Sequence, residues 1–580
     1  MNTITPNQIP DGVAPGRRGN FRSLKGIRRG STLPAVMVIL TFLATGLGTY
    51  LFSLRGVRSI QDQRVMGDRG FMAAEAGLAK AISKLSALNS LPTAKTTWSM
   101  DVPTADFWPF QSVTVNVFPS VVSGQQAWTL VSTAVSDSAD KRHVPQARRA
   151  QATFVMQNFS RYDMFVNNYG GVIQSGYYHF EGFGETFLGP FHCNTGLALW
   201  PNFWVNKETT SSASMGTRYF ANWSSYNVSD ANANNYVNIL NYYNSTYGQA
   251  PKFYGGLSIL PAPISLPADM STDPRALKLR QNAGLSLPAG YSGYDATKGP
   301  NFTVDLVTTT TNAADSTVVV KQYLGTSGGV PTYGPARTFN IDGINNAMIV
   351  YGNIKSLKGT LRGNLTIAAM KSPTTSGTGG IDITGNLEYA TRKANASFQY
   401  SNTPSLYTNG GADINMTTVD TLLNQASSVT DSLGLISETD IFIKEKDLNG
   451  NLVAAGSTPL YVDGMMMATG ANSGSAQGGQ FGPENSWTRA TGTVYLFGGS
   501  VQNYMNGWAM YSGSTLTNGL IANRLWDNRN YVTGLGPPSY PITGVLSFYG
   551  KSWLASSVKS ASDSAKVPPT SGTGAWTTVQ

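Results

Sequence analysis

The sequence of 580 residues is long enough for two to four domains, but only 13% of it is charged, about half of the roughly 25% that is usual. The 62 glycines, together with many Asn, Ser, Thr and Tyr residues, favour a β-rich body with polar loops over a helical enzyme. A single cysteine, Cys193, excludes an intrachain disulfide, and the three histidines show no metal-ligand spacing, so we expect no zinc site and no cofactor.

The positive charge is concentrated in residues 1–30, which we interpret as a basic cytoplasmic leader. Six basic residues and Asp11 give this segment a net charge of +5, so the remaining 550 residues hold only +4 of the total of +9. No dense basic face is left for a phosphate backbone, and no nucleic-acid partner is expected. The charge is instead a signal of membrane topology, because basic residues beside a span stay in the cytoplasm. The residues that carry it are Arg17, Arg18, Arg22, Lys25, Arg28 and Arg29.

Residues 31–54 form an uncharged, apolar stretch of 24 residues that predicts a transmembrane helix. About 20 apolar residues in a helix cross the roughly 30 Å hydrocarbon core of a membrane. A secretory signal peptide would need a small-residue cleavage site after this stretch, and none follows, so a buried core helix is the remaining alternative. With the leader in the cytoplasm, we expect the rest of the chain to be exported and membrane lipid to be a partner.

An amphipathic continuation of this helix is predicted for residues 55–88. Its apolar positions recur at spacings of three and four, and they are Phe71, Ala74, Leu78, Ala81, Ile82, Leu85 and Leu88. Residues 89–160 then contain three segments, 112–118, 128–135 and 148–157, in which apolar and polar residues alternate. Three short antiparallel strands of this kind can cover the helix, which predicts a small α+β unit with a β-meander.

The segment FMAAEAGLAKAISKL follows a basic leader, Gly30 and an uncharged run, and this arrangement resembles the N-terminus of type IV pilin-like proteins, specifically the PilX-like pilus-assembly family. The matching residues are Ala73, Ala74, Glu75, Ala76, Gly77 and Leu78, within residues 28–88. The resemblance implies a single-pass protein of the bacterial inner membrane, whose partners are other pilin-like subunits and the pilus assembly machinery. It also implies a peptidase cut after Gly30, which would leave Ser31 as the new N-terminus.

One position departs from the pilin pattern. Major pilins carry a glutamate as the fifth residue after the cut, and the corresponding residue here is Ala35. That carboxylate pairs with the free amine of a neighbouring subunit in an apolar filament core, where an unpaired charge would be costly. Its absence favours a minor or tip subunit over the repeating subunit of a filament, and it leaves open that Gly30 is not cut.

Residues 161–555 are predicted to form an extracytoplasmic β-rich domain, and residues 556–580 a flexible C-terminal tail. Gly352, Gly359, Gly363 and Gly385 stand where short strand-like runs must turn sharply. Short strands with one-glycine corners favour a parallel β-solenoid, with a β-sandwich as the alternative. Several pieces, among them GPFHCN and VYGNIKSLKGTLRGNLTIAA, resemble an uncharacterised extracytoplasmic domain found behind pilin-like N-termini.

Two groups in this domain could carry chemistry, and we interpret both as structural. His192 could be a ligand or a general base, but no second histidine or acidic cluster lies close to it in sequence, which favours a hydrogen-bonded turn residue. Asp527 and Arg529 could form a catalytic pair, although a salt-bridged or capping pair at a strand corner is the preferred interpretation. We therefore predict no catalytic residue and no metal site.

Three functions remain compatible with these features. The first is a minor pilin-like subunit of a type IV pilus or related secretion system, with an exported body, periplasmic or on the cell surface, for binding or adhesion. The second is a membrane-tethered β-solenoid that acts on or binds polysaccharide. Catalysis there would need paired carboxylates or a basic cluster, and the 32 acidic residues show no such grouping. The third, a surface adhesin with aromatic contact groups and a surface ligand as partner, merges with the first.

Overall fold

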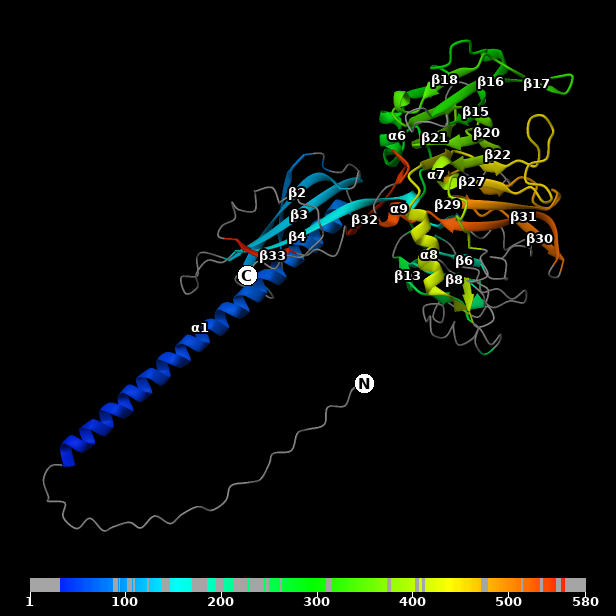
Figure 1. Cartoon of the computed structure of the whole chain (residues 1–580). Helices are drawn as coiled ribbons and strands as arrows, with labels where there is room; N and C mark the ends of the chain where they lie inside the picture. Colours follow the sequence, from blue (N-terminus) through cyan, green and yellow to red (C-terminus); the bar gives the residue numbers. More distant parts are fainter. Residues whose placement is uncertain are drawn as a thin grey trace. The chain divides into compact units, whose positions relative to one another are not determined.

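The structure is a computed structural model, and its chain divides after Arg69 into two units, Met1–Arg69 and Gly70–Gln580 (Figure 1). The basic leader, Gly30, Ser31 and the tail beyond residue 558 lie outside the described residues, as does Leu88. The described residues are 32–86, 92, 94–101, 107, 110–122, 125–136, 147–168, 185–194, 203–212, 218–219, 227–228, 245, 250–260, 263–308, 316–372, 377–401, 406–408, 413–470, 478–512, 515–532, 536–548 and 554–558.

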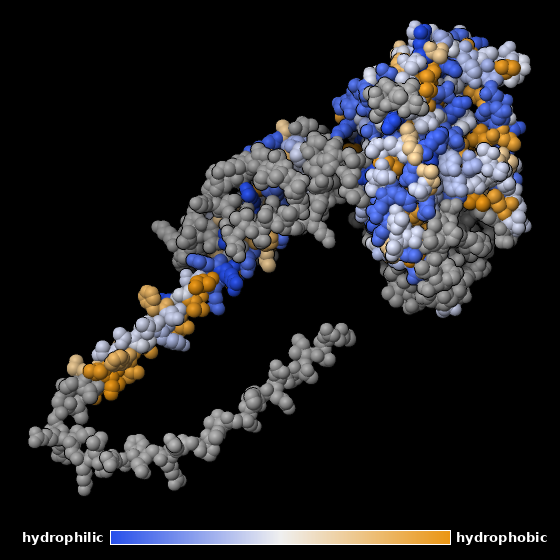
Figure 2. Space-filling view, viewed as in Figure 1, coloured by the Kyte–Doolittle hydropathy of each residue, from blue (hydrophilic) through white to orange (hydrophobic). Residues whose placement is uncertain are grey.

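A single helix of 55 residues, α1 (Thr32–Ser86), covers nearly the whole predicted span and its continuation. From Val36 to Leu54 its side chains are exposed and largely apolar, with Phe42 at 76% and Phe52 at 81% exposure (Figure 2). The hydroxyls of Thr41 and Thr49 donate to the carbonyl oxygens four residues earlier, at 2.7 and 2.9 Å, which satisfies them within the helix. Among the described residues α1 is the one helix long and apolar enough to cross a membrane.

The second half of α1 packs on an antiparallel meander, and we call this unit the head. Its strands β1 (Thr96–Asp101), β2 (Phe110–Val122), β3 (Gln125–Ser136) and β4 (Ala147–Asn158) pair in chain order. Ala74, Leu78 and Leu85 of α1 are buried against Val115 of β2 and Trp128 of β3. β2, β3 and β4 contain the three segments expected to alternate, β1 is a further strand, and the expected apolar positions from Phe71 to Leu85 lie in or against this core.

Two further strands complete the sheet of the head from the far end of the sequence. β32 (Ile542–Phe548) and β33 (Leu554–Val558) both pair antiparallel with β4. The sequence analysis assigned residues up to 555 to the extracytoplasmic domain, since alternation of side chains does not reveal which distant strand fills a sheet edge. The head therefore consists of two separate chain segments, and the residues between them, 159–541, form what we call the body.

The body is mostly β-structure, and its longest feature is a ladder of parallel strands. In spatial order the ladder runs β14–β19–β21–β25–β27–β29–β5–β7–β9–β13. Its strands in chain order are β5 (Met164–Asn168), β7 (Phe191–Cys193), β9 (Thr209–Ser212), β13 (Leu257–Leu260), β14 (Leu285–Leu287), β19 (Ala347–Tyr351), β21 (Asn364–Met370), β25 (Ser432–Ser437), β27 (Leu460–Ala468) and β29 (Gly492–Tyr504).

Three more sets of parallel strands accompany this ladder. One is β15–β20–β22–β26–β28, another is β27–β29–β31, and the third is β6–β8–β12. Their bounds are β6 (Glu185–Phe187), β8 (Phe203–Val205), β12 (Lys252–Phe253), β15 (Asn301–Val307), β20 (Asn353–Leu361), β22 (Ile381–Tyr389), β26 (Ile441–Ile443), β28 (Phe481–Pro483) and β31 (Thr515–Trp526).

Antiparallel strands and short helices decorate these ladders, so the sheets of the body are mixed. β16, β17 and β18 extend β15, and β30 pairs with β31. The bounds are β10 (Arg218–Tyr219), β11 (Asn227–Val228), β16 (Thr317–Ser327), β17 (Val330–Tyr333), β18 (Arg337–Asn340), β23 (Tyr407–Thr408), β24 (Asp413–Ile414) and β30 (Ala509–Ser512). The helices are η1 (Phe159–Arg161), η2 (Pro274–Ala276), α6 (Leu277–Asn282), η3 (Ala296–Lys298), η5 (Asp342–Ile344), α7 (Ala390–Lys393), α8 (Met416–Ser427) and α9 (Arg529–Val532).

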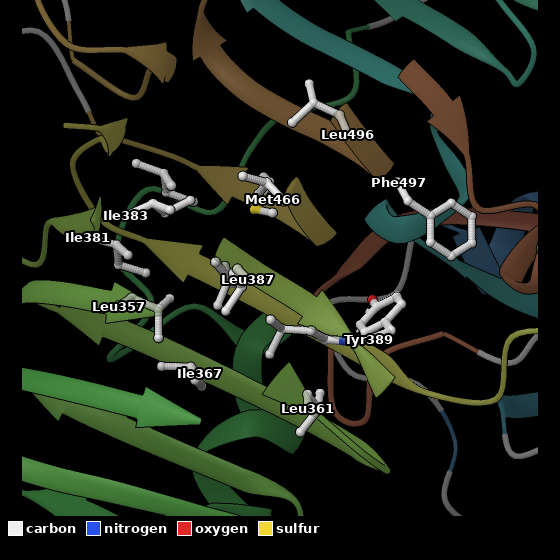
Figure 3. Close-up of a cluster of buried hydrophobic side chains, with 14 of the residues drawn as sticks. Leu357, Leu361, Ile367, Ile381, Ile383, Leu387, Tyr389, Met466, Leu496 and Phe497 are labelled. Atoms are coloured by element: carbon white, nitrogen blue, oxygen red, sulfur yellow. Dashed lines mark hydrogen bonds between the residues drawn. The ribbon is translucent and has the colours of Figure 1, made fainter. Parts of the chain in front are cut away.

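Successive strands bury aliphatic side chains in a common interior. Leu357, Ile381, Ile383 and Leu496 are among the residues that gather there (Figure 3). An asparagine ladder links neighbouring strands at one edge: Asn194 donates to Asn167 at 2.8 Å, and Asn167 donates to Asn503 at 2.6 Å. The interior therefore continues across the junction of β5 with β29, where the two ends of the body sequence meet.

Several glycines lie where the backbone of a neighbouring strand is too close for a side chain, and Gly464 and Gly498 do so inside β27 and β29. Gly498 stands in register with Gly464, and its φ of 152° places a hypothetical Cβ 1.8 Å from the carbonyl oxygen of Gly464. No side chain fits there without displacing backbone. Of the four corner glycines expected from the sequence, Gly359 and Gly363 have φ of 123° and 100°, and Gly352 is near extended at 159°. Gly385 lies instead inside β22, in a stretch where the register with β20 shifts.

Candidate functional site

The AAEAG segment of α1 is a packing surface of the head. Ala73, Ala74 and Leu78 are fully buried. A Cβ on Gly77 would lie 2.5 Å from Cγ1 of Val113 on β2, so the glycine lets the helix approach the sheet closely. Glu75 is only partly buried. The motif that carries the resemblance is thus explained by helix–sheet contact among the described residues.

His192 is a buried structural residue. Its Nε2 donates to Oδ1 of Asn194 at 2.7 Å, because that oxygen is an acceptor that also receives the backbone N–H of Ile264. Its Nδ1 lies 2.7 Å from the hydroxyl of Thr210 and accepts from it in this tautomer. The ring stacks on Phe165 at 4.7 Å, and burial lowers the pKa of His192 to about 4. The interpretation as a hydrogen-bonded structural residue agrees with this geometry, but His192 lies in the strand β7 and not in a turn.

Asp527 and Arg529 form the salt-bridged pair that the sequence analysis preferred. Nε of Arg529 donates to Oδ1 of Asp527 at 2.8 Å, and Nη2 donates to Oδ2 at 2.5 Å. Both side chains are nearly buried, and Nη1 also donates to the carbonyl oxygen of Val429. A bidentate pair of this kind fixes the corner after β31.

A hollow of about 620 Å³ lies beside α7, and we call it the tyrosine groove. It lies where α7 and the residues after it pass over β27 and β29. A volume between about 300 and 1,000 Å³ is typical of ligand pockets. Its lining combines aromatic, charged and amide side chains: Glu388, Arg392, Lys393, Asn395, Ala396, Phe398, Gln399, Tyr400, Tyr461 and Tyr495.

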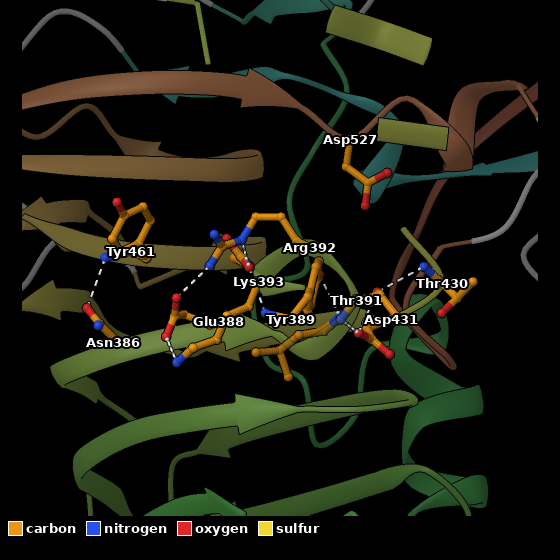
Figure 4. A network of polar contacts seen from close by, with 12 residues as sticks. Asn386, Glu388, Tyr389, Thr391, Arg392, Lys393, Thr430, Asp431, Tyr461 and Asp527 are labelled. Carbon is orange, nitrogen blue, oxygen red and sulfur yellow. Dashed lines mark hydrogen bonds and ion pairs between the residues drawn. The ribbon is translucent and has the colours of Figure 1, made fainter. Parts of the chain in front are cut away.

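Four ions beneath the groove form a continuous network (Figure 4). Arg392 donates from Nε to Asp463 at 2.7 Å and from Nη2 to Glu388 at 2.8 Å. Lys393 donates to the other oxygen of Glu388 at 2.8 Å, and the backbone N–H of Tyr389 donates to Asp463 at 2.6 Å. Burial raises the pKa of Asp463 to about 7, against the opposing charge of Arg392. The network ties α7 to β22 and β27 and so fixes the position of Arg392 at the groove.

The aromatic side chains form a connected series along the groove. Tyr461 and Tyr495 occupy paired positions on β27 and β29, and their rings stack at 5.1 Å with an interplanar angle of 15°. Tyr400 packs on Tyr495 at 4.8 Å, and Phe398 packs on Tyr400 at 5.5 Å. The guanidinium of Arg392 lies 5.0 Å from the Tyr461 ring centroid, a cation–π contact. Tyr461 and Tyr495 remain partly exposed.

The sequence analysis missed this groove, although a signal for it exists. Tyr461 precedes Gly464 by three residues, and Tyr495 precedes Gly498 by the same interval. Since the two glycines are register partners, alignment of the two segments on these glycines places the tyrosines side by side. None of the predicted topology or cleavage residues lies among the described residues, so the structure does not test them.

No protein-family model and no curated protein sequence matches this chain. Among solved structures, the chain is similar to the competence-associated pilin ComZ from Thermus thermophilus. The match has 14% sequence identity, covers 85% of this chain and 98% of that chain, and has a TM-score of 0.27. Values this low do not establish a shared fold.

Proposed function

We propose that this chain is a minor, pilin-like subunit of a type IV pilus or a related secretion system. Its PilX-like N-terminal region would anchor it in the bacterial inner membrane by one span, with the basic leader in the cytoplasm. The head and body would then stand in the periplasm or on the cell surface, where the body binds a ligand. Its partners would be membrane lipid, other pilin-like subunits and the assembly machinery, and we assign it no catalytic activity.

The observation that carries this proposal is the change of character along α1. Its first half presents exposed apolar residues from Val36 to Leu54. Exposure of these side chains to water is unfavourable, whereas contact with lipid or with a neighbouring helix would be favourable. Its second half is buried in an α+β head through Ala74, Gly77 and Leu78. One continuous helix that joins an apolar span to a small folded head suits a subunit that is held by its helix and displays its head and body.

The test is the N-terminus of the protein from its native membrane. Mass spectrometry should find Ser31 as the first residue, and a Gly30→Leu variant should retain the leader, because a bulky residue at the cut blocks a peptidase that requires glycine. Both forms should stay in the membrane fraction after carbonate extraction. An intact Met1 in the unaltered protein, or a cut after residue 54, would contradict the pilin assignment.

We further infer that the body is a parallel β-solenoid. The support is the in-register parallel pairing of consecutive strands, the paired glycines Gly464 and Gly498, and the asparagine ladder through Asn167. Such a body is a rigid, elongated display surface. An experimental structure of the exported part would test the arrangement: parallel pairing of β25, β27 and β29 in one continuous ladder is expected, and two antiparallel sheets packed face to face would contradict it.

The second candidate function is a membrane-tethered solenoid that binds polysaccharide, and the tyrosine groove favours it. Both candidate functions include the membrane anchor and the exported body. They differ in the role of the body, which is part of a pilus assembly in the first and binds polysaccharide in the second. Binding of soluble oligosaccharides by the full chain separates the two, since a purely structural subunit has no need of a saccharide site.

A further inference from the structure

We propose that the tyrosine groove binds a short stretch of an uncharged polysaccharide chain. The inference rests on the proposed export of the body, and it names the ligand that the body would meet there. It concerns recognition alone and involves no reaction.

The chemistry of a sugar chain matches the lining of the groove. A sugar ring has apolar C–H faces and a rim of hydroxyl groups, so a site for it needs aromatic surface with hydrogen-bonding groups close by. The ring faces of Tyr461 and Tyr495 are taken up by Arg392, by each other and by Tyr400, so these partly exposed tyrosines offer a ligand their apolar ring edges and polar hydroxyl ends. Asn395 and Gln399 add amide groups, which both donate and accept, from the segment after α7.

The groove is held in shape before any ligand arrives. Tyr461 and Tyr495 are fixed by the register of β27 and β29, and Tyr400 packs behind Tyr495. The Arg392 guanidinium, itself held by Asp463 and Glu388, lies over the Tyr461 ring. A ligand therefore orders few side chains on binding, and the entropic cost is low.

Both cations of the groove already have carboxyl partners. The guanidinium of Arg392 is engaged by two carboxyl groups at 2.7 and 2.8 Å, and the ammonium of Lys393 is engaged by Glu388 at 2.8 Å. A sulfate, phosphate or uronate at Arg392 would compete with these carboxyl groups, whereas the Lys393 side chain is 56% exposed and keeps contact with solvent. A neutral saccharide leaves the network intact.

The experiment titrates the full chain, in a detergent without a sugar headgroup, with oligosaccharides by isothermal calorimetry. The probes are the neutral hexasaccharides of cellulose, starch and chitin, and an anionic hexauronate. We expect at least one neutral probe to bind, with an affinity that changes little from low to high salt, since no net charge is neutralised. Tyr461→Ala and Tyr495→Ala should each weaken binding by about tenfold or more.

The matched control is Tyr333→Ala. Tyr333 also sits in a strand, faces a second tyrosine, Tyr323, at 6.1 Å and has the Lys321 ammonium 5.6 Å from its ring, but it lies outside the groove. This variant should bind as the unaltered chain does. Because Gln399 is exposed, Gln399→Ala tests the groove even if a tyrosine variant fails to fold, and it should weaken binding as well.

Three results would overturn the proposal: no binding of any neutral probe, binding of the hexauronate alone, or equal binding by the unaltered chain and the groove variants. None of them touches the pilin assignment, which stands or falls on the N-terminus at Ser31. Conversely, if a chain that keeps Met1 binds saccharide, the saccharide-binding proposal is supported and the pilin assignment is contradicted.

Discussion

Asn158 at the end of β4 is the register partner of Ile542 at the start of β32, although the whole body separates them in sequence. Next to this pair, the backbone N–H of Phe159 donates to the carbonyl oxygen of Pro541 at 3.0 Å, and Asn530 donates to Asn158 at 2.6 Å. The chain therefore enters and leaves the body at one point, and the body is an insertion into the head.

The first prediction is that the head folds without the body. Replacement of residues 159–541 by an Asn-Gly turn should connect β4 to β32 as a hairpin, since antiparallel partners can be joined by two residues. The shortened chain should unfold cooperatively on heating, as followed by circular dichroism in detergent. Loss of a cooperative transition, with β3 amides exchanging freely with solvent, would show that the head depends on the body.

The second prediction separates packing from recognition in the AAEAG segment. Gly77→Leu should destabilise the head by about 2 kcal/mol or more, because its side chain would overlap Val113 of β2. Glu75 is partly buried and does not belong to the core of the head. Glu75→Ala should therefore change the unfolding free energy by less than about 0.5 kcal/mol. Urea denaturation of both variants provides the comparison, and equal losses would refute the packing explanation.

The third prediction concerns the paired glycines Gly464 and Gly498. Gly498→Ala should cost about 3 kcal/mol or more, since its Cβ would meet a backbone oxygen that no rotamer change can move. Gly343→Ala is the matched control, because its Cβ would find its nearest neighbour at 3.9 Å. The midpoints of thermal unfolding should therefore differ widely between the two, and similar midpoints would count against this close approach.

The fourth prediction tests the bidentate pair after β31. Asp527→Ala leaves the Arg529 guanidinium buried without its carboxylate and should cost about 3–5 kcal/mol. The double variant Asp527→Leu, Arg529→Met should recover much of that loss, because two apolar side chains need no partner. Denaturant titration of the double variant and of its two single variants, Asp527→Leu and Arg529→Met, gives the coupling energy. A coupling energy near zero would mean that the pair contributes nothing as a pair.

The fifth prediction is a pH dependence that originates at His192. Its pKa is about 4 in the folded chain and 6.5 ordinarily, so the unfolded chain binds more protons between these values. Stability is therefore lost as the pH falls from about 6.5 to about 4, by up to about 3 kcal/mol from this residue. Comparison with His192→Gln isolates the effect, because the variant keeps every other titrating group. The unaltered chain should show the steeper loss; parallel curves would contradict the assignment.

Local patterns predicted the elements that depend on local periodicity. The helix expected over residues 31–88 is α1 (Thr32–Ser86), and the strands expected at 112–118, 128–135 and 148–157 lie within β2, β3 and β4. A buried apolar face has to recur at the period of its element, so both its existence and its members can be read from one segment. The mainly-β character of the body followed from its composition in the same way.

Pairings between distant segments could not be predicted in this way. The sequence around Ile542 does not predict that its strand partner is Asn158, because the edge of a strand offers the same backbone N–H and C=O groups to any extended segment. The tyrosine groove depends on such a pairing too, since Tyr461 and Tyr495 meet only through the register of β27 with β29. The domain boundaries drawn from composition stay a prediction, and the strand β33 (Leu554–Val558) runs across the division expected at residue 555.

The pairing of β5 with β29 also dictates an order of assembly. β5 is the first strand of the body to leave the ribosome, and its partner on one side comes from residues 500–504, near the end. Until those residues arrive, β5 has an open edge, and an open edge invites pairing with the wrong chain. Contacts across so much sequence form slowly. The edge of β5 is therefore completed only when nearly the whole body has been synthesised, and a partly made chain stays open to mispairing until then.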